Sequence, residues 1–225
     1  FDQLHEHRFA LLRKAYERSG ISANPDYQNF IRDNGWWLND YALFMALKTF
    51  FHDQPFRAWP EDIRMHWGFA LEHYNRELYF DIEFQKYMQF KFNQQWSRLK
   101  AYANGKHIQI VGDIPIYVSP DGADVWAHPE LFQLDAHNAP TAIAGCPPDA
   151  FAEDGQAWGN PLYNWNFHRA TDYAWWVSRM WYSFKLYDVV RIDHFRGFDE
   201  YFSIPADAKT ARDGHWEKGP GMELF

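Results

Sequence analysis

Two charged side chains stand at the end of an apolar run in residues 187–198, whose sequence is YDVVRIDHFRGF. The run contains two consecutive valines, which is typical of a buried β-strand. Because successive side chains of a strand point to opposite faces, we expect Arg191 and Asp193 to share a face. In barrels built from parallel strands, catalytic residues occupy the carboxyl ends of the strands. We therefore expect Asp193 to belong to a functional site.

The spacing of Arg191 and Asp193 fits two interpretations. A guanidinium beside a carboxylate favours its ionised form and fixes its direction, and a carboxylate nucleophile requires both. A purely structural ion pair that closes the strand end would have the same spacing. The residues alone leave both interpretations open.

A second strand is predicted at residues 107–113, where HIQIVGD ends in Asp113 after a long helical pattern. A helix is predicted at residues 167–187, directly before the strand of Asp193. This alternation of helix and strand predicts a parallel sheet of β-α units, with a further strand at residues 201–204. The carboxylates of Asp113 and Asp193 are then expected to end adjacent strands.

The first hundred residues show helical periodicity and no convincing strand. Helices are predicted over residues 2–19, from Asn24 to about residue 34, over residues 37–51, from Pro60 onward, and over residues 81–103. We therefore divide the chain into a mostly helical subdomain at residues 1–105 and a β/α region at residues 106–225.

Residues 119–166 carry little regular pattern and are rich in proline, glycine, aspartate, alanine and tryptophan. A connection of this length without secondary structure is usually either functional or disordered. Its many aromatic residues argue against disorder. The segment is therefore predicted to be a long functional loop.

Composition narrows the classes of function. Aromatic residues make up 20% of the 225 residues, which suits a core of large rings or a cleft that stacks on sugars. The net charge of −8 without a basic run argues against nucleic acid, and no apolar run approaches the roughly 18 residues of a membrane span. The single cysteine, Cys146, suits a reducing compartment such as the cytoplasm.

The motif RIDHFRG at residues 191–197 resembles the nucleophile motif of the 4-alpha-glucanotransferases (amylomaltase, or disproportionating enzyme), relatives of the alpha-amylases. Five further segments resemble that family in the same order: WLNDYALFMAL at 37–47, GDIPIYV at 112–118 with DVWAHP at 124–129, GCPPD at 145–149, GQAWGNPLY at 155–163 and KGPG at 218–221. The resemblance extends over nearly the whole chain. Linked motifs of this kind are specific, whereas one alone would not be.

The resemblance implies a role for each site residue. Asp193 would form the covalent bond to the glycosyl group, and Arg191 would hydrogen-bond Asp193. The residues implied to contact substrate are Asp113, His194, Gln156, Trp158, Phe151 and Asn160. The implied reaction transfers α-1,4-glucan segments from a maltooligosaccharide donor to an acceptor with retained configuration. At Ala150, next to Phe151, the chain lacks a ring that family members often carry.

The resemblance also implies an α/β fold: part of a (β/α)8 TIM barrel with a mostly helical inserted subdomain. The family's acid/base glutamate follows on a later strand, and its first strands come earlier, so we expect an internal fragment that is inactive alone and poorly stable or self-associating. No metal and no organic cofactor is implied, and nucleic acid and membranes are not expected partners. Two alternatives remain: a related α-glucosidic hydrolase, and a non-catalytic glucan-binding module.

Overall fold

The computed structural model describes residues 2–225, and their side chains from residue 7 onward. It contains two compact units, one that ends at Leu99 and one that begins at Lys100. The boundary falls within the helix α5 (Tyr79–Asn104). We describe each unit separately.

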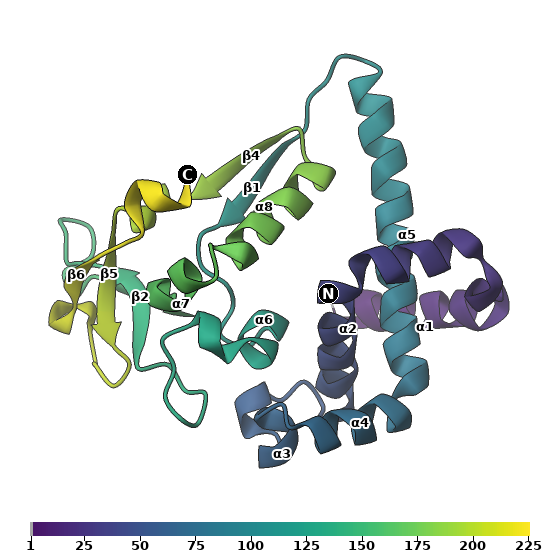
Figure 1. Ribbon diagram of the computed structural model, residues 1–225, viewed down its shortest axis with the longest axis horizontal. Helices are drawn as coiled ribbons and strands as arrows, with labels where there is room; N and C mark the ends of the chain where they lie inside the picture. The colour runs from purple at the N-terminus through teal and green to yellow at the C-terminus, as the bar shows by residue number, and fades with distance from the viewer. Residues whose placement is uncertain (1) are drawn as a thin grey trace. The chain divides into compact units, whose positions relative to one another are not determined.

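The first unit is helical throughout its regular structure (Figure 1). Its helices are α1 (Asp2–Ser19), α2 (Pro25–Phe50), α3 (Glu61–Arg64), α4 (Gly68–Glu77) and most of α5, with 3-10 turns at Ile21–Ala23 and Phe56–Ala58. The predicted start of α2 is confirmed, because the Asn24 side chain accepts hydrogen bonds from the backbone N–H groups of Asp26 and Tyr27. Pro25 occupies the first helical position, where its missing N–H costs nothing.

The prediction of two helices between Asn24 and residue 51 is wrong, because α2 is continuous. The gap between the two predicted helices contains Gly35, which lies in the interior of α2. The buried residues Phe30, Asn34 and Leu38 recur at four-residue spacing across it, and the Asn34 amide donates to the Phe30 carbonyl at 2.8 Å. A glycine inside a helix costs about 1 kcal/mol, which burial of one continuous apolar face outweighs.

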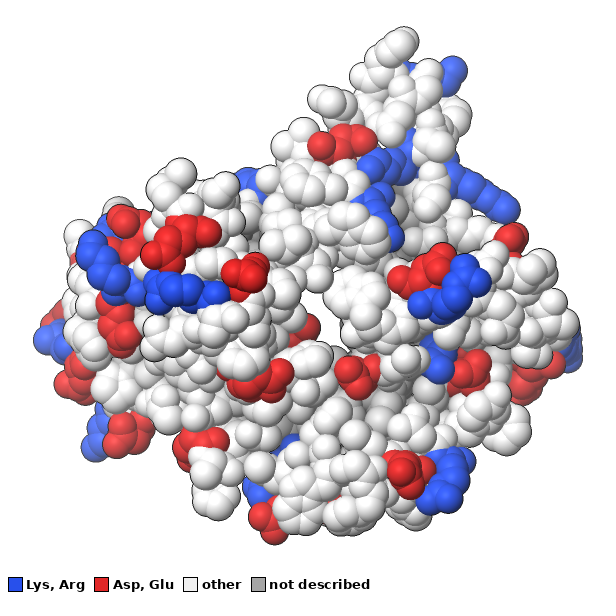
Figure 2. Space-filling model, in the orientation of Figure 1, with Lys and Arg blue, Asp and Glu red and all other residues white. Residues whose placement is uncertain are grey.

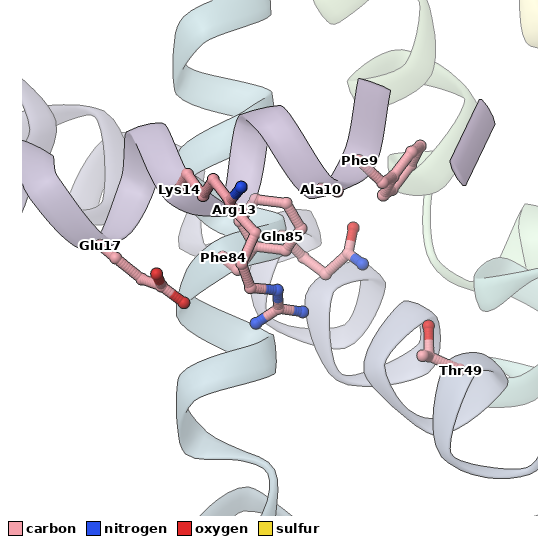
Figure 3. Close-up of a pocket in the computed structure, with 8 residues that line it drawn as sticks. All are labelled: Phe9, Ala10, Arg13, Lys14, Glu17, Thr49, Phe84 and Gln85. Carbon is pink, nitrogen blue, oxygen red and sulfur yellow. The ribbon is translucent and has the colours of Figure 1, made fainter. Parts of the chain in front are cut away.

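Aromatic rings of α2 and α5 form the core of the helical unit. Tyr27, Phe84 and Phe90 are buried there, and the rings of Tyr27 and Phe90 meet edge to face. Above this core, α1, α2 and α5 line a groove of about 440 Å³ (Figure 3). Arg13 lies over the Phe84 ring at 4.2 Å and pairs with Asp81 at 2.6 Å, so its charge is already partnered.

In the second unit, β1 (Val111–Pro115) and β4 (Val189–Asp193) are parallel neighbours, which confirms the predicted parallel pairing. The strand β1 begins later than predicted, because the N–H of Ile108 still bonds back to the carbonyl of Ala103 at the end of α5. Asp113 therefore lies in the middle of β1, opposite Arg191, and Pro115 is the residue opposite Asp193. The two carboxylates are close, but they do not both end a strand.

The helix predicted at residues 167–187 is divided into α7 (Trp165–Ala170) and α8 (Ala174–Leu186). Asp172 and Tyr173 separate them with φ values of 50° and 55°. The N–H of Tyr173 bonds to the carbonyl of His168 at 2.7 Å, which closes α7. The apolar spacing continues across the break, so periodicity did not reveal it.

The interpretation of residues 119–166 as a structureless loop is wrong. They contain α6 (Ala123–Ala127), β2 (Ala142–Cys146) and β3 (Gln156–Pro161). With β5 (Glu200–Pro205) and β6 (His215–Lys218), these strands form an antiparallel sheet in the order β3-β2-β5-β6. The strand expected at residues 201–204 therefore exists but belongs to this sheet. The remaining 3-10 turns are Pro129–Leu131, Phe195–Phe198, Ala211–Asp213 and Gly221–Leu224.

Basic and acidic side chains are interspersed on the face that Figure 2 shows. Within residues 2–225, no helix is both long and apolar enough to cross a bilayer. Among residues 7–225, whose side chains the structure describes, no three His, Cys, Asp or Glu side chains come together in a way that could hold a metal ion.

Candidate active site

One guanidinium joins the two predicted carboxylates. Nη1 of Arg191 donates to Oδ2 of Asp113 at 2.5 Å, and Nη2 donates to Oδ1 of Asp193 at 3.1 Å. The shared face of Arg191 and Asp193, predicted from alternation, is thereby confirmed. The bond to Asp113 follows from the register, which places Asp113 directly opposite Arg191. The register between these two strands could not be predicted from the sequence.

The exposure of this trio weakens its interpretation as a structural ion pair. The side chains of Arg191, Asp113 and Asp193 are 62%, 54% and 63% exposed. Ion pairs at that exposure contribute about 0–1 kcal/mol to stability. The two ion pairs therefore contribute little to the stability of the fold. They hold two carboxylates in fixed directions at the solvent-exposed surface.

A small cavity of about 140 Å³ adjoins Asp193. It is lined by Pro115, Ile116, Tyr117, Trp158, Asn160, Asp193 and His194. The structure thus brings four of the predicted residues, Asp193, His194, Trp158 and Asn160, to one cavity. They come from β3, from β4 and from the residue that follows β4.

Three rings form one wall of the cavity. The rings of Trp158 and His194 meet edge to face with centroids 4.9 Å apart, and Tyr117 lies 6.3 Å from each. Edge-to-face contacts of this kind are favourable because the positive ring edge meets the negative face. The cavity therefore combines an apolar wall with a carboxylate.

His194, whose ring belongs to this wall, has an uncommon backbone conformation. It follows β4 with a φ of 54°, in the left-handed region. Its Nε2 is buried and has no hydrogen-bond partner among the residues that the structure describes. Burial lowers the pKa of His194, Arg196 lowers it further, and Asp193 opposes the shift. The neutral imidazole can therefore donate a hydrogen bond to a hydroxyl or accept one from it near pH 7.

The polar side chains of β3 have partners of their own. Nε1 of Trp158 donates to Oε1 of Gln156 at 3.0 Å, which fixes the indole from its outer edge. Nδ2 of Asn160 donates to the carbonyl of Val118 at 2.7 Å and so ties β3 to the segment after β1. Gln156 does not line the cavity and is connected to it only by its hydrogen bond to Trp158, whereas Asn160 is a lining residue.

Phe151 does not join the cavity. It is 99% exposed at the tip of the connection between β2 and β3. Oδ1 of Asp149 accepts hydrogen bonds from the N–H groups of Phe151 and Ala152 at 2.8 and 2.7 Å. Arg212 pairs with Asp154 at 2.8 Å and with Glu153 at 2.9 Å. These contacts hold the backbone of the tip in place, and the Phe151 ring is left exposed to solvent.

Sequence reasoning assigned no role to Tyr117. Its ring also stacks on Tyr163, with centroids 6.0 Å apart, and it is buried. The available signal was its position just beyond a predicted strand of a parallel pair, where functional residues concentrate. It lies four positions beyond Asp113, and its contacts with Trp158 and His194 cannot be inferred from that spacing.

Comparison with known proteins identifies the family of this chain. A family model described as 4-alpha-glucanotransferase matches residues 1–225. The 4-alpha-glucanotransferase of Clostridium butyricum is 46% identical over 219 residues, which is 97% of this chain and 45% of that protein. The enzyme of the same name from Streptococcus pneumoniae is 47% identical over 220 residues, 97% of this chain and 44% of the relative.

A solved structure is similar over the full length of the chain. The amylomaltase from Streptococcus agalactiae in complex with acarbose superposes with a TM-score of 0.95 at 43% identity, over 100% of this chain and 46% of that one. The chain thus has the α/β fold of the corresponding part of an amylomaltase, and it spans less than half the length of the relatives that it matches. The family model over the whole chain, with relatives at this level of identity, shows that the chain belongs to the 4-alpha-glucanotransferase family.

Proposed function

We propose that the protein carrying this chain transfers α-1,4-glucan segments between maltooligosaccharides by a retaining double displacement, with Asp193 as the nucleophile. The observation that carries the proposal is the pair of exposed carboxylates, Asp113 and Asp193, joined by Arg191 beside an aromatic cavity. Membership in the family supports the reaction class.

In the first displacement, an oxygen of Asp193 attacks the anomeric carbon of the donor glucan. The glycosidic bond breaks, and a carboxylic acid about 5–5.5 Å from the nucleophile protonates the leaving oxygen. Arg191 occupies Oδ1 of Asp193 and so leaves Oδ2 for the new bond. In the second displacement, the 4-hydroxyl oxygen of an acceptor sugar attacks the anomeric carbon, the bond from that carbon to Asp193 breaks, and the hydroxyl proton passes to the carboxylate that the first step left.

The remaining predicted residues would bind sugar. Asp113 and neutral His194 offer hydrogen bonds to hydroxyls, while Trp158 offers an apolar face. The Asp113 carboxylate is already engaged by Arg191, so it suits the role of hydroxyl acceptor. We propose that the protonating acid is a glutamate outside residues 1–225, as the family pattern implies. Gln156 and Asn160 would then bind sugar or hold the wall in place, and Phe151 would meet an acceptor chain.

The wider setting follows from the same proposal. The strands β1 and β4 would be neighbours in a (β/α)8 barrel, and residues 1–105 would form its helical insertion. The 225-residue chain would then be inactive by itself. We place the protein in the cytoplasm, because Cys146, the one cysteine in residues 1–225, is a free thiol that suits a reducing compartment.

The test is to incubate the protein carrying this chain with maltotriose and to resolve the products by length. We expect glucose together with maltopentaose and longer chains, and neither product from Asp193→Asn. The matched control is Asp199→Asn, which removes an exposed carboxylate outside the cavity and is expected to keep full activity. Glucose and maltose without longer chains would identify a hydrolase. Binding that is lost on Trp158→Ala, without any product from the wild type, would identify a glucan-binding module.

A second arm uses the 225-residue chain alone. We expect it to form no product from maltotriose, and acarbose, present in the Streptococcus agalactiae amylomaltase structure, serves as the probe for binding. Product formation by this chain would show that an acid within residues 1–225 protonates the leaving group.

A further inference from the structure

Arg179, on α8, binds the backbone at the point where β1 ends. Its Nη2 donates to the carbonyl of Pro115 at 2.5 Å, and its Nη1 donates to the carbonyl of Ile116 at 2.9 Å. The Tyr163 hydroxyl donates to the same Ile116 carbonyl at 2.6 Å. In Figure 1, α8 runs beside β1, which is consistent with these contacts. Two neighbouring carbonyls are thus held by one planar cation.

The guanidinium has little freedom to move. It lies 4.8 Å from the centroid of Trp176 and 5.4 Å from that of Trp175, and Nη1 also contacts the Tyr163 hydroxyl at 3.3 Å. Trp176 and Tyr163 are buried. Stacking on fixed rings and a rigid fork of donors distinguish arginine from lysine, which offers a single point charge on a flexible stem.

The segment that Arg179 holds forms one side of the candidate site. Pro115, Ile116 and Tyr117 all line the cavity beside Asp193. Asp113, two residues before Pro115, accepts the hydrogen bond from Arg191. The ring of Tyr117, one residue beyond Ile116, contacts Trp158 and His194.

We propose that Arg179 is a positioning residue for the transfer reaction, and this inference rests on the proposed function. It does not line the cavity. Arg179 fixes the backbone at Pro115 and Ile116. The position of this backbone in turn sets the positions of the Asp113 carboxylate and the Tyr117 ring. Misplacement of reacting groups by about 1 Å costs up to about 100-fold in rate, so a loosened segment lowers kcat even when the fold is intact.

The test compares three variants of the protein carrying this chain, assayed with maltotriose. Arg179→Met removes both hydrogen bonds and is expected to lower kcat about 10- to 100-fold with a smaller change in KM. Arg179→Lys keeps the charge and should recover part of that loss. The control is Lys185→Met, which removes another cation from α8; Lys185 lies 3.4 Å from the centroid of Trp181 and lines no part of the cavity. It should retain the wild-type kcat and KM.

Folding is measured on the same samples by circular dichroism and thermal melting. Wild-type kcat in a folded Arg179→Met variant would overturn the inference. A loss of activity that only follows the unfolded fraction would overturn it as well, because that result describes a stabilising residue.

A spectroscopic arm separates this inference from the proposed function. In the protein carrying this chain, Arg179→Lys is expected to shift the indole N–H resonance of Trp158, and Lys185→Met is expected to leave it unchanged. If the wild-type protein has no transferase activity, the proposed function fails and this arm still tests the positioning. An unshifted indole resonance in Arg179→Lys would then reject it.

Discussion

At the scale of single residues, Arg191 does what no lysine in its place could do. A guanidinium offers several donors in a fixed plane, and Arg191 uses two of its nitrogens on two different carboxylates. An ammonium group carries its donors on a single nitrogen at the end of a flexible stem, so it would not hold two carboxylates in fixed directions. The separate roles that we propose for Asp113 and Asp193 would therefore depend on one side chain.

We expect Arg191→Lys in the protein carrying this chain to lower the transfer rate about 10- to 100-fold, because both carboxylates lose their orientation. The free energy of unfolding should change by no more than about 1 kcal/mol, since the ion pairs are exposed. Product analysis with maltotriose and denaturant unfolding measure the two effects. Arg196→Lys is the matched control, because Arg196 is an exposed neighbour that stacks on Trp216 and pairs with Glu200. Equal rates for the two variants would contradict the bridging role.

His168 makes the free energy of unfolding depend on pH. Its side chain is fully buried among aromatic rings, Nε2 lies 3.2 Å from the carbonyl of Leu131, and Nδ1 is without a partner in the described part of the chain. Burial lowers its pKa to about 4, and the Leu131 carbonyl opposes the shift. The folded protein thus keeps His168 neutral at a pH where the unfolded chain, with an ordinary pKa near 6.5, binds a proton.

The contribution of His168 to the free energy of unfolding should therefore be constant above about pH 6.5 and fall as the pH drops toward about 4, by up to about 3 kcal/mol. Denaturant unfolding between pH 7.5 and pH 4.5 measures the slope. His168→Gln, which does not titrate, should reduce the slope, and His194, whose pKa burial also lowers, contributes to the slope that remains. His137→Gln, at an exposed position, should leave the wild-type slope. A wild-type slope in His168→Gln would rule out this assignment.

At the scale of elements, the pairing of β1 with β4 depends on a close approach at Gly112. A Cβ at this position would overlap ring carbons of Tyr187, the residue that leads from α8 toward β4. Because β1 also carries Asp113, a shift of this strand reaches the candidate site.

Gly112→Ala should lower the free energy of unfolding by about 1–3 kcal/mol, the usual cost of overpacking a filled site. Denaturant unfolding of the 225-residue chain measures it. Gly68→Ala is the control, because a Cβ there meets open space at the start of α4 and alanine is the better helix former. If both substitutions were harmless, the Tyr187 ring would have to move freely.

At the scale of the whole molecule, the second unit exposes apolar side chains on elements that usually bury them. They are Val111 of β1, Val189 of β4, and Val177, Trp181 and Phe184 of α8. Exposed strand edges and large apolar patches promote association.

We expect the 225-residue chain to self-associate as its concentration rises, and sedimentation velocity measures this. Introducing charge on α8 with Val177→Glu and Phe184→Glu should shift the distribution toward monomer. A wild-type chain that stays monomeric at high concentration, with a sharp melting transition, would contradict the expectation.

Features that depend on near neighbours along the chain could be predicted from the sequence. The cap at Asn24, the long α5 and the shared face of Arg191 and Asp193 each follow from periodicity or from side chains a few residues apart. The motif around Asp193 also identified the family, because its residue types and spacing are read directly from the chain.

Contacts between residues remote in sequence could not be predicted and are seen only in the folded chain. The bond from Arg191 to Asp113 requires a register between residues 78 positions apart. The strands β2 and β3 form in a segment whose local pattern favoured a loop, because they pair with each other and with β5. The contacts of Tyr117 with Trp158, and of Arg179 with Ile116, have no local signal either. The physical reason is the same in each case. Strand pairing and ring packing gain their energy from contacts between segments remote in sequence, and local propensity does not encode them.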